Sequence, residues 1–536
     1  MKKIISLLLV LTMVFALAAC GGSTESTQTP AAPSTNTPPP TNTTSEAPTA
    51  PAAAYKDELN IAINANPPTL DAHFANTNIV GTIGSHIYEP LFAMNADNVP
   101  TAVLADSYTV SEDGLVYTIK LRQGVKFHNG QEMKADDVVA SMDNWLGKST
   151  KATPLAGTTF AKVDDYTITM TLPAPFSGAL DILAGNVQFA AIYPKSSLDN
   201  AGESGITEYI GTGPYKLVEW KQDQYIHITR NDDYQQPAGE SSGFTGKKEA
   251  ATKDIFFRFI TDATTRIAGI QTGEYDISDG ITTELYQTLV GDPSVALFTK
   301  PGGTINLFFN TTDGVMANET MRDAVMAALN CDDIMMASYV DPGLYSLNQG
   351  WMIPTSATYG SENGEHYNQN NVEKAKELLK EAGYNGEKFV LLTTPDYPAM
   401  YNATMVVHAQ LVAAGINAEV ESSDFATFMN KKGDTKLFGA FITSNSYNIL
   451  PVTLSVLNTG WAGLNAPEVT EGIEKIKNAA SAEEAGQAWA ELEEFLYDYG
   501  AASVLGHYYD IMATTAGVEG FNFFNFPIYW NVKVPA

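Results

Sequence analysis

The sequence predicts an α/β protein built from two or three domains. Two periodicities occur along the chain: alternation of apolar and polar residues, typical of strands, and apolar residues every three or four positions, typical of helices. The composition becomes globular only from about residue 57. The roughly 480 residues that follow are too many for a single hydrophobic core. Strands and helices mix throughout this part, which favours the α/β class.

The predicted strands are short runs rich in β-branched and aromatic residues. In chain order they are VYTIKLR (116–122), YTITMTL (166–172), YKLVEW (215–220), YIHITR (225–230), NAEVES (417–422) and FGAFIT (438–443).

The clearest predicted helix is NVEKAKELLKEAG (371–383), where Gly383 is placed to end a helix with one apolar face. We expect further helices in ETMRDAVMAALN (319–330) and in the long segment 469–499. The run 135–137 should begin another helix, because its two aspartates favourably oppose the helix dipole in the first turn.

The first 19 residues have the order of a secretory signal: a basic start, a short apolar run and small residues at the end. The ending Leu17-Ala18-Ala19-Cys20 resembles the lipobox of bacterial lipoproteins. We therefore expect residues 1–19 to be a signal peptide and Cys20 to carry the lipid after cleavage. The alternative is an ordinary signal with an incidental cysteine. No later run approaches the roughly 20 apolar residues needed to cross a bilayer.

Residues 20–56 predict a disordered tether behind the lipidated cysteine. The stretch 21–56 holds seven prolines and no basic residue before Lys56, so it cannot bury a core. Cys331 is the only cysteine besides Cys20, so lipidation of Cys20 leaves no disulfide within the chain, and no CxxC motif is present.

The charge balance is strongly acidic, with 31 basic and 61 acidic residues and a formal net charge of −30. Such a chain repels nucleic acid and anionic lipid head groups. We expect no nucleic-acid partner, and contact with the membrane only through the lipid anchor.

The sequence offers no catalytic constellation. GESSG (239–243) matches the G-x-S-x-G nucleophile elbow, but it lies in a polar loop instead of between a strand and a helix. The seven histidines form no short metal-ligand spacing, and GTGPY (211–215) lacks the GK[ST] of a P-loop. We predict no catalytic residue, no metal site and no cofactor, so the protein should not be an enzyme.

Several segments, in this order, resemble the family 5 extracellular solute-binding proteins, which serve ABC importers of peptides, nickel chelates and related solutes. The strongest block is VYTIKLRQGVKFHNGQEMKADDVVASMDNW (116–145), and the second is IGTGPYKLVEW (210–220). Weaker blocks are NPPTLDAHFANT (66–77), IYEPLF (87–92), ATTRIAGIQTGEYDI (263–277), FFNTTDGVMANETMRDAVMAALN (308–330), AQLVAAGINAEVESSDFATFM (409–429) and VEGFNFFNF (518–526).

This resemblance implies a two-lobed fold like that of periplasmic binding proteins (class II, in the cluster of large members with an extra subdomain in lobe I). The ligand cleft would lie between the lobes, and ligand would shift an equilibrium between open and closed forms. By analogy, lobe I covers about 57–303 with the inserted subdomain near 100–205. Lobe II covers about 304–508, and the chain returns to lobe I over 509–536.

The resemblance also shows a departure at the expected pocket. Dipeptide binders of this family hold the ligand's ammonium and carboxylate groups with an aspartate and an arginine. The corresponding stretches here, ITSNSYNILP (442–451) and TTPDYPAMYN (393–402), contain no acid and no base respectively. A buried ligand charge without a partner is costly, which disfavours a free dipeptide.

A longer peptide held through its backbone, a sugar stacked on aromatic rings and a neutral small solute remain open. The candidate ligand-binding residues are polar or aromatic and are expected on facing surfaces of the two lobes. They are Asn76 and Thr77 from lobe I, and Trp351, Tyr397, Ser444, Asn445, Tyr447 and Trp461 from lobe II. Asn445 and Tyr447 are favoured because a loop after the 438–443 strand would face the cleft. For each aromatic candidate, the tryptophans included, core packing is the alternative.

The predicted function is capture of a solute, first of all a peptide, for an ABC importer. We expect the protein at the outer face of the bacterial cytoplasmic membrane, anchored by lipid, monomeric, and delivering solute to permease subunits and their ATPases. The alternatives are import of an oligosaccharide or another small solute, or a surface sensor or adhesin that uses the fold without a transporter.

Overall fold

The computed structural model describes residues 55–202, 205–361, 364–457 and 464–536. The chain divides into two units, Met1–Ala52 and Ala53–Ala536, and every described residue lies in the second. The predicted signal peptide, Cys20, Trp461 and the tether as far as residue 54 lie outside the described residues. The last two residues of the predicted tether are paired with the C-terminal part of the chain, since Lys56 donates its N–H to the carbonyl of Val534.

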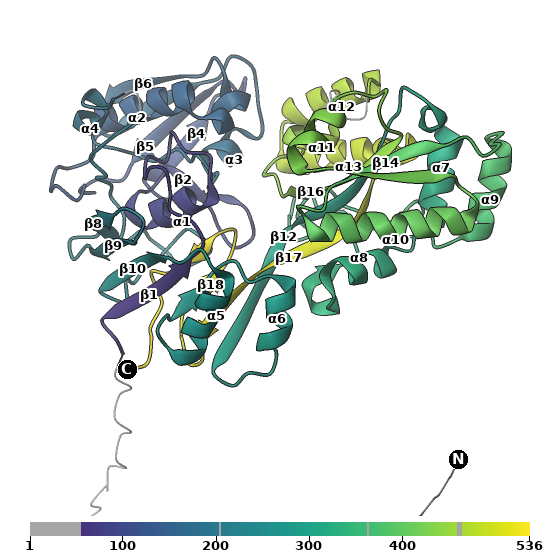
Figure 1. Cartoon of the computed structure of the whole chain (residues 1–536). Helices are drawn as coiled ribbons and strands as arrows, with labels where there is room; N and C mark the ends of the chain where they lie inside the picture. The colour runs from purple at the N-terminus through teal and green to yellow at the C-terminus, as the bar shows by residue number, and fades with distance from the viewer. Residues whose placement is uncertain (1–54, 203–204, 362–363, 458–463) are drawn as a thin grey trace, which may run out of the picture. The chain divides into compact units, whose positions relative to one another are not determined.

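Two long antiparallel strands, β12 (Val295–Phe309) and β17 (Ala502–Thr515), run through both lobes (Figure 1). They are central strands of one eleven-stranded sheet, in the order β15-β14-β16-β12-β17-β11-β1-β10-β9-β8, with β13 paired to β17 outside that path. The register of the pair shifts between Pro301 and Gly303, because proline has no N–H to give to a central ladder. The predicted lobe boundaries, at 303/304 and 508/509, fall at the paired residues Gly303 and Tyr508 beside this irregularity.

Lobe I contains the half of the sheet in which β1 pairs in parallel with β10. A separate apolar core lies here, with Leu59, Ile61 and Trp530 fully buried. The strands are β1 (Glu58–Ile63), β8 (Tyr215–Lys221), β9 (Tyr225–Arg230), β10 (Asp254–Phe259) and β11 (Ile277–Ser278), and the helices are α1 (Asn78–Ile87), α5 (Ala263–Thr272) and α6 (Thr283–Leu289). Two small hairpins complete it, β2 (Phe92–Met94) with β3 (Pro100–Ala102) and β18 (Asn522–Phe523) with β19 (Pro527–Ile528).

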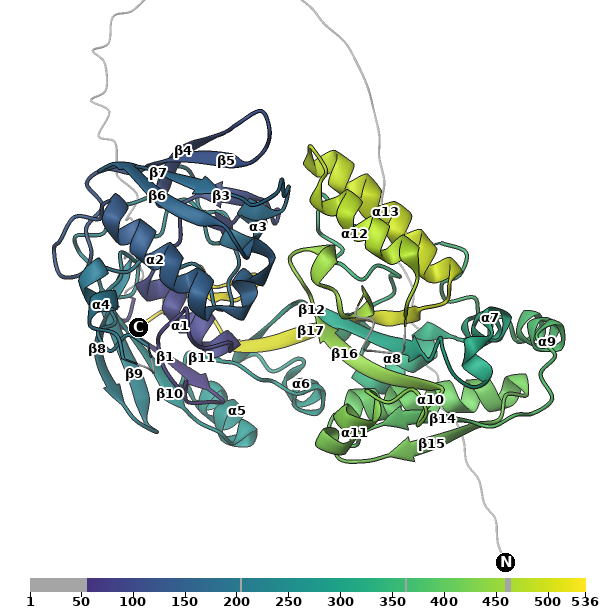
Figure 2. The same cartoon turned by 90° about the horizontal axis from the view of Figure 1, so that it is seen from above.

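The inserted subdomain is a four-stranded antiparallel sheet in the order β4-β5-β7-β6, with α2 against β6 (Figure 2). Alternation puts Tyr117, Ile119 and Leu121 of β5 on its buried face. The elements of this subdomain and of the chain that follows it are β4 (Ala105–Val110), β5 (Val116–Leu121), α2 (Ala135–Lys148), β6 (Thr159–Asp164), β7 (Thr167–Thr171), α3 (Ala179–Leu183) and α4 (Lys195–Asp199).

Lobe II contains the other half of the sheet, where β14 pairs in parallel with both β15 and β16. Its strands are β13 (Tyr345–Ser346), β14 (Phe389–Thr393), β15 (Ala418–Ser422) and β16 (Ala440–Ser446). Its helices are α7 (Glu319–Ala328), α8 (Cys331–Tyr339), α9 (Val372–Glu381), α10 (Pro398–Ala414), α11 (Phe425–Lys431), α12 (Pro467–Lys477) and α13 (Ala482–Asp498). Short 3-10 turns lie at Thr150–Leu155, Val315–Ala317, Pro342–Leu344, Pro451–Thr453 and Ser455–Leu457.

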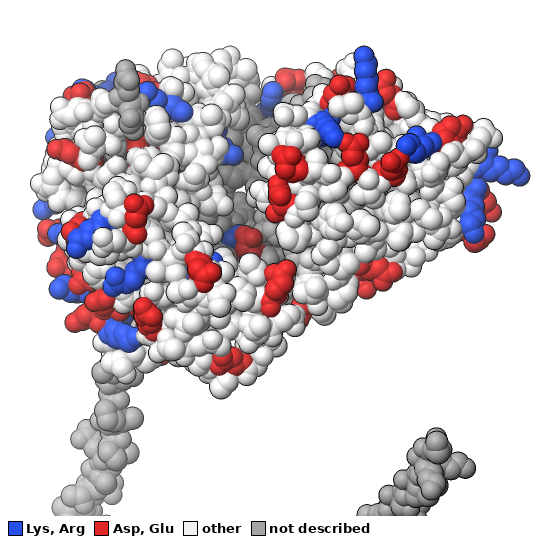
Figure 3. Space-filling view, viewed as in Figure 1, with Lys and Arg blue, Asp and Glu red and all other residues white. Residues whose placement is uncertain are grey.

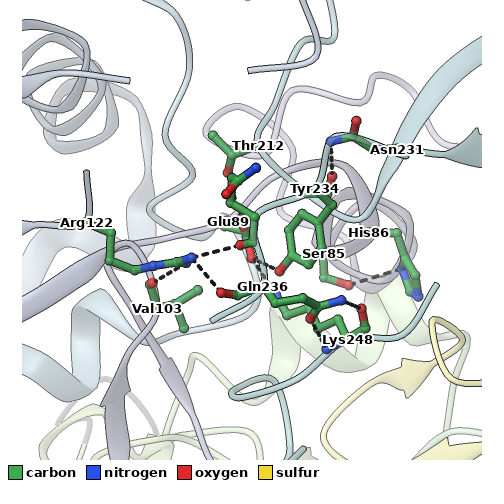
Figure 4. Close-up of polar contacts among 12 residues, drawn as sticks. Ser85, His86, Glu89, Val103, Arg122, Thr212, Asn231, Tyr234, Gln236 and Lys248 are labelled. Atoms are coloured by element: carbon green, nitrogen blue, oxygen red, sulfur yellow. Dashed lines mark hydrogen bonds and ion pairs between the residues drawn. The ribbon is translucent and has the colours of Figure 1, made fainter. Parts of the chain in front are cut away.

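Lobe I is tied together by a buried charged network around Glu89, just after the C-terminal end of α1 (Figure 4). The Glu89 carboxylate accepts hydrogen bonds from Lys248 Nζ (2.8 Å), Tyr234 Oη (2.6 Å) and Thr212 Oγ1 (2.9 Å). The Glu89 and Lys248 side chains are 1% and 3% exposed, so this ion pair is shielded from solvent. Beside it, Arg122 donates to the carbonyl oxygens of Val103, Gln235 and Gln236. These contacts fix α1 and β5 to the loops of lobe I.

Candidate solute-binding site

A furrow runs between the two lobes on the face shown in Figure 3, and described residues of both lobes are in contact. Ser177 of the inserted subdomain donates its N–H to the carbonyl of Lys477 (3.1 Å) and its hydroxyl to that of Ile476 (3.0 Å). A Cβ on Gly178 would lie 2.6 Å from Leu450 Cδ1, and one on Gly185 would lie 3.2 Å from Ile449 Cδ1. The segment after β16 therefore packs against lobe I.

A polar cluster lies on one face of the sheet in lobe II. Two of its residues, Asn445 and Tyr447, come shortly before Ile449 and Leu450 in the sequence. The register pairs Thr304 of β12 with both Asn445 of β16 and His507 of β17, so the three side chains share a face. Asn306 lies two residues along the same face and donates through Nδ2 to Thr304 Oγ1 (2.9 Å) and Asn445 Oδ1 (3.0 Å). The hydroxyl of Tyr447 is hydrogen bonded to His507 Nδ1.

The cluster is neutral at physiological pH. Burial lowers the pKa of His507 to about 4, so its imidazole is uncharged. Burial also raises the pKa of Tyr447, which keeps its hydroxyl protonated. Asn306 is 1% exposed, and its Oδ1 has no hydrogen-bond partner among the described residues. The cluster thus presents polar groups without charge, one of them a buried acceptor.

The structure brings two predicted residues, Asn445 and Tyr447, together in this cluster. Both residues were predicted to lie in a loop after the 438–443 strand. This was wrong for Asn445, which is still within strand β16. β16 continues to Ser446 because Asn445 pairs with Thr304 on the neighbouring strand.

Ser444 and Trp351 lie elsewhere in lobe II. Ser444 pairs with Ile305, so it is on the opposite face of β16 from Asn445. Trp351 is 3% exposed, with its ring centroid 4.7 Å from that of Tyr497 in the core. This is the core packing named as the alternative for the tryptophans.

Among the described residues, the other three predicted positions are at the surface. Tyr397 is 47% exposed immediately before α10, with its ring edge-on to Phe425 at 4.8 Å. Asn76 and Thr77 are exposed at the start of α1 in lobe I, and the side chain of Thr77 makes no capping hydrogen bond.

Sequence reasoning missed several polar residues of lobe II. Asn306 and His507 interrupt otherwise apolar strand runs (NLFF and VLGH), a signal that could have marked them as functional. Glu493 on α13 holds a loop that begins at Trp351, because its carboxylate accepts from the Trp351 N–H (3.2 Å) and from the Ser361 hydroxyl. Burial raises the pKa of Glu493 to about 7. No periodicity could have identified this long-range contact.

Within the described residues, no group of three histidine, cysteine or acidic side chains could hold a metal ion. Cys331 is buried, and burial raises the pKa of its thiol to about 12. The GESSG loop (239–243) contains no strand or helix, so the described backbone does not form a nucleophile elbow. No helix in the described ranges is long and apolar enough to cross a membrane.

Comparison with known proteins places this geometry in a family. Residues 99–465 match the model of the bacterial extracellular solute-binding proteins, family 5 Middle. The chain is 30% identical to the glutathione-binding protein GsiB of Escherichia coli O1:K1 over 375 residues, which cover 68% of this chain and 70% of that protein. It is 31% identical to GsiB of Salmonella paratyphi A over 383 residues, 70% of this chain and 71% of that protein.

Solved structures show the same fold. The substrate-binding protein CtaP of Listeria monocytogenes aligns with a TM-score of 0.75 at 21% identity, covering 87% of this chain and 96% of that one. DppA of Helicobacter pylori, in complex with the peptide STSA, aligns with a TM-score of 0.68 at 21% identity, covering 90% and 99%. The predicted two-lobed α/β fold is confirmed. The chain belongs to family 5 of the bacterial extracellular solute-binding proteins, which bind solutes for ABC importers.

Proposed function

We propose that this protein captures a short peptide between its lobes and delivers it to an ABC permease. The observation that carries the proposal is a free backbone edge on β16. β14 pairs with β16 only at Ala440 and Phe441, since β14 ends at Thr393, shortly before Pro395. Along Thr443–Ser446, no described residue pairs with the β16 edge that faces away from β12.

An extended peptide can complete such an edge. Its N–H and C=O groups would continue the ladder, and this supplies affinity for a backbone whatever its side chains are. Four strand residues span about 13 Å at roughly 3.3 Å per residue, which suits a peptide of about three or four residues. The edge leads directly into the segment that packs on lobe I.

The neighbouring polar cluster fits the same ligand. Asn445 lies on this strand, and Tyr447 follows its last residue. The buried Oδ1 of Asn306 could accept a hydrogen bond from an amide N–H of the peptide. The exposed Asn76 and Thr77 would face the solute from lobe I. Relatives named as glutathione-binding, and a structural neighbour solved with a peptide, are consistent with a peptidic solute.

The experiment is a thermal-shift screen of the purified folded chain with trialanine, glutathione, maltotriose and nickel–histidine. A ligand that binds only the folded form stabilises it by about 2.7 kcal/mol at a concentration of 100 times its Kd. We expect trialanine or glutathione to raise the melting temperature and to compact the protein in X-ray scattering. If maltotriose alone raised the melting temperature, the solute would be a sugar and the peptide proposal would be wrong.

The anchoring at Cys20 is a second part of the proposal. It is supported by the signal-like order of residues 1–19 and the Leu17-Ala18-Ala19-Cys20 ending. Two acyl chains would hold the protein firmly at the outer face of the cytoplasmic membrane. Metabolic labelling with radioactive palmitate should mark the wild-type chain and fail to mark Cys20→Ser; equal labelling of both would refute the anchor.

A further inference from the structure

Two neighbouring residues of lobe I, Ser177 and Gly178, make close contacts with lobe II. They lie between β7 and α3, and Gly178 is the residue just before α3. Ser177 donates its N–H to the carbonyl of Lys477 (3.1 Å) and its hydroxyl to the carbonyl of Ile476 (3.0 Å). One residue of lobe I thus gives two hydrogen bonds to backbone groups of the other lobe.

The two acceptors are at the C-terminal end of α12. The last carbonyl groups of a helix have no N–H partner within that helix. They also carry the negative end of the helix dipole, which favours hydrogen-bond donors at this position. Asn478, which follows the helix, gives its own N–H to the carbonyl of Glu474. Ser177 therefore caps α12 from the opposite lobe.

Gly178 lets an apolar side chain of lobe II come close. An added Cβ at this position would lie 2.6 Å from Leu450 Cδ1 and 3.0 Å from Phe176 Cζ. Leu450 is 2% exposed, so water is excluded from this contact. The backbone of Gly178 has a φ of −84°, which every L-residue can adopt. What the contact requires at residue 178 is therefore space, and not the conformational freedom of glycine.

The two contacts belong to one surface of lobe II. α12 packs against the 3-10 turn Pro451–Thr453, which begins immediately after Leu450. Because Ser177 and Gly178 are adjacent, they touch the end of α12 and Leu450 at the same time.

This surface is away from the strands that join the lobes. Figures 1 and 2 both show α3 and α12 apart from the place where β12 and β17 pass between the lobes. A rotation of one lobe about these strands moves remote points farthest. Because a hydrogen bond is lost once its atoms are about 3.6 Å apart, a small rotation would break both bonds of Ser177. The pairing of β12 with β17 does not depend on these bonds.

The contact is also close in sequence to the proposed solute site. The free edge of β16 ends at Ser446, four residues before Leu450. The chain that would bind a peptide backbone thus continues directly into the chain that meets Gly178.

We propose that Ser177 and Gly178 form a latch that holds the lobes closed on a bound solute. This inference rests on the proposed function and concerns how the solute is retained. The solute enters before the latch forms and leaves only after the latch has opened. The latch should therefore slow dissociation and leave association almost unchanged.

Stopped-flow kinetics of trialanine and glutathione binding test the latch with the double variant Ser177→Ala/Gly178→Ala. The first change removes the hydroxyl that bonds to Ile476, and the second puts a methyl group against Leu450. We expect dissociation to become about 5- to 50-fold faster, because a neutral hydrogen bond is lost and an apolar contact is forced apart. Association should change by less than about 2-fold.

Gly147→Ala is the matched control. Gly147 lies on α2 of the same lobe, and an added Cβ there would meet no described side chain within 4 Å. This variant should keep both rate constants. Ser177→Thr retains a hydroxyl and should dissociate more slowly than Ser177→Ala. If the double variant released the peptide at the wild-type rate, the latch would be overturned while the peptide function would stand.

If neither trialanine nor glutathione binds wild type, the peptide function fails, and X-ray scattering tests the latch alone. A larger radius of gyration for the double variant than for wild type and Gly147→Ala supports the latch, whereas equal radii overturn it. Should the double variant not fold, Ser177→Ala and Gly178→Ala are measured singly. Wild-type behaviour of both single variants would overturn the latch as well.

Discussion

Two buried carboxylates, Glu89 in lobe I and Glu493 in lobe II, are held in different ways. Glu89 in lobe I is bound by a lysine, a tyrosine and a threonine, and its ion pair is almost fully shielded. Glu493 in lobe II accepts from a backbone N–H and a serine hydroxyl, and no described cation pairs with it. A buried charge with a partner can stay ionised, whereas one without a cation is more easily kept neutral by a proton.

The two carboxylates also fix different kinds of segment, a helix in lobe I and a loop in lobe II. Glu89 fixes the end of α1, whose other end carries the exposed Asn76 and Thr77. Glu493 fixes the loop that begins at Trp351 and contains Ser361. We infer that α1 of lobe I is held by a buried ion pair, whereas the loop of lobe II is held through a group whose pKa is raised to about 7.

The largest expected effect comes from breaking the ion pair of lobe I. Lys248→Met should destabilise the protein by about 3–5 kcal/mol, because it leaves Glu89 buried without its cation. The measurement is urea unfolding followed by fluorescence.

The double variant Lys248→Met with Glu89→Gln provides the control. It removes both charges, so it should recover part of the loss. If the single and double variants were equally destabilised, lost packing rather than an unpaired charge would explain the effect.

Glu493 should give the stability of the wild type a pH dependence of opposite sign to that of a salt-bridged acid, and Glu493→Gln should remove it. The pKa of Glu493 is raised from 4.5 to about 7 by burial, so its stabilising contribution is full below 4.5 and is lost as the pH rises through 7. The amide can accept from Trp351 and donate to Ser361 without titrating. We expect equal stability of wild type and variant near pH 4.5, and a variant more stable by about 1–3 kcal/mol at pH 8.

Glu493→Ala is the matched control for this second variant. It loses both hydrogen bonds to the loop and also lacks the titrating group, so it should be less stable than Glu493→Gln at every pH in the same thermal unfolding series. A Glu493→Gln variant whose stability runs parallel to wild type from pH 4.5 to 8 would show that Glu493 stays ionised.

In the polar cluster, the expected effects are on solute binding. Asn445→Ala combined with Tyr447→Phe removes neutral hydrogen-bonding groups and should weaken binding of trialanine by about 5- to 50-fold, since each such bond contributes about 0.5–1.5 kcal/mol. Tyr225→Phe, which removes an exposed tyrosine hydroxyl bonded to Glu219 in lobe I, is the control and should bind as wild type does. Unchanged affinity in the double variant would remove these residues from the site.

Much of the fold could be predicted because local patterns determine it. Each of the six predicted strands overlaps an observed strand, and the 371–383 helix is observed as α9, capped by Asn371 and followed by Gly383 at positive φ. The prediction for 469–499 missed that this segment is two helices, α12 and α13, since Ser481 caps the second.

The site could be predicted only in part, because it depends on pairing between distant strands. Asn445 and Tyr447 were visible next to a strand, but Asn306 and His507 join them only through the register of β12 and β17.

The smallest expected effect is at an exposed ion pair that has the same chemistry as the pair in lobe I. Lys195 and Asp199 are one helical turn apart on α4, with side chains 52% and 60% exposed. Water and salt already screen these charges, so Lys195→Met should change stability by at most about 0.5 kcal/mol, and by less in 1 M salt. The same lysine-to-methionine change at Lys248 should cost several times more and respond little to salt, because its surroundings exclude water. Similar losses at both positions in one unfolding series would mean that burial does not distinguish the two pairs.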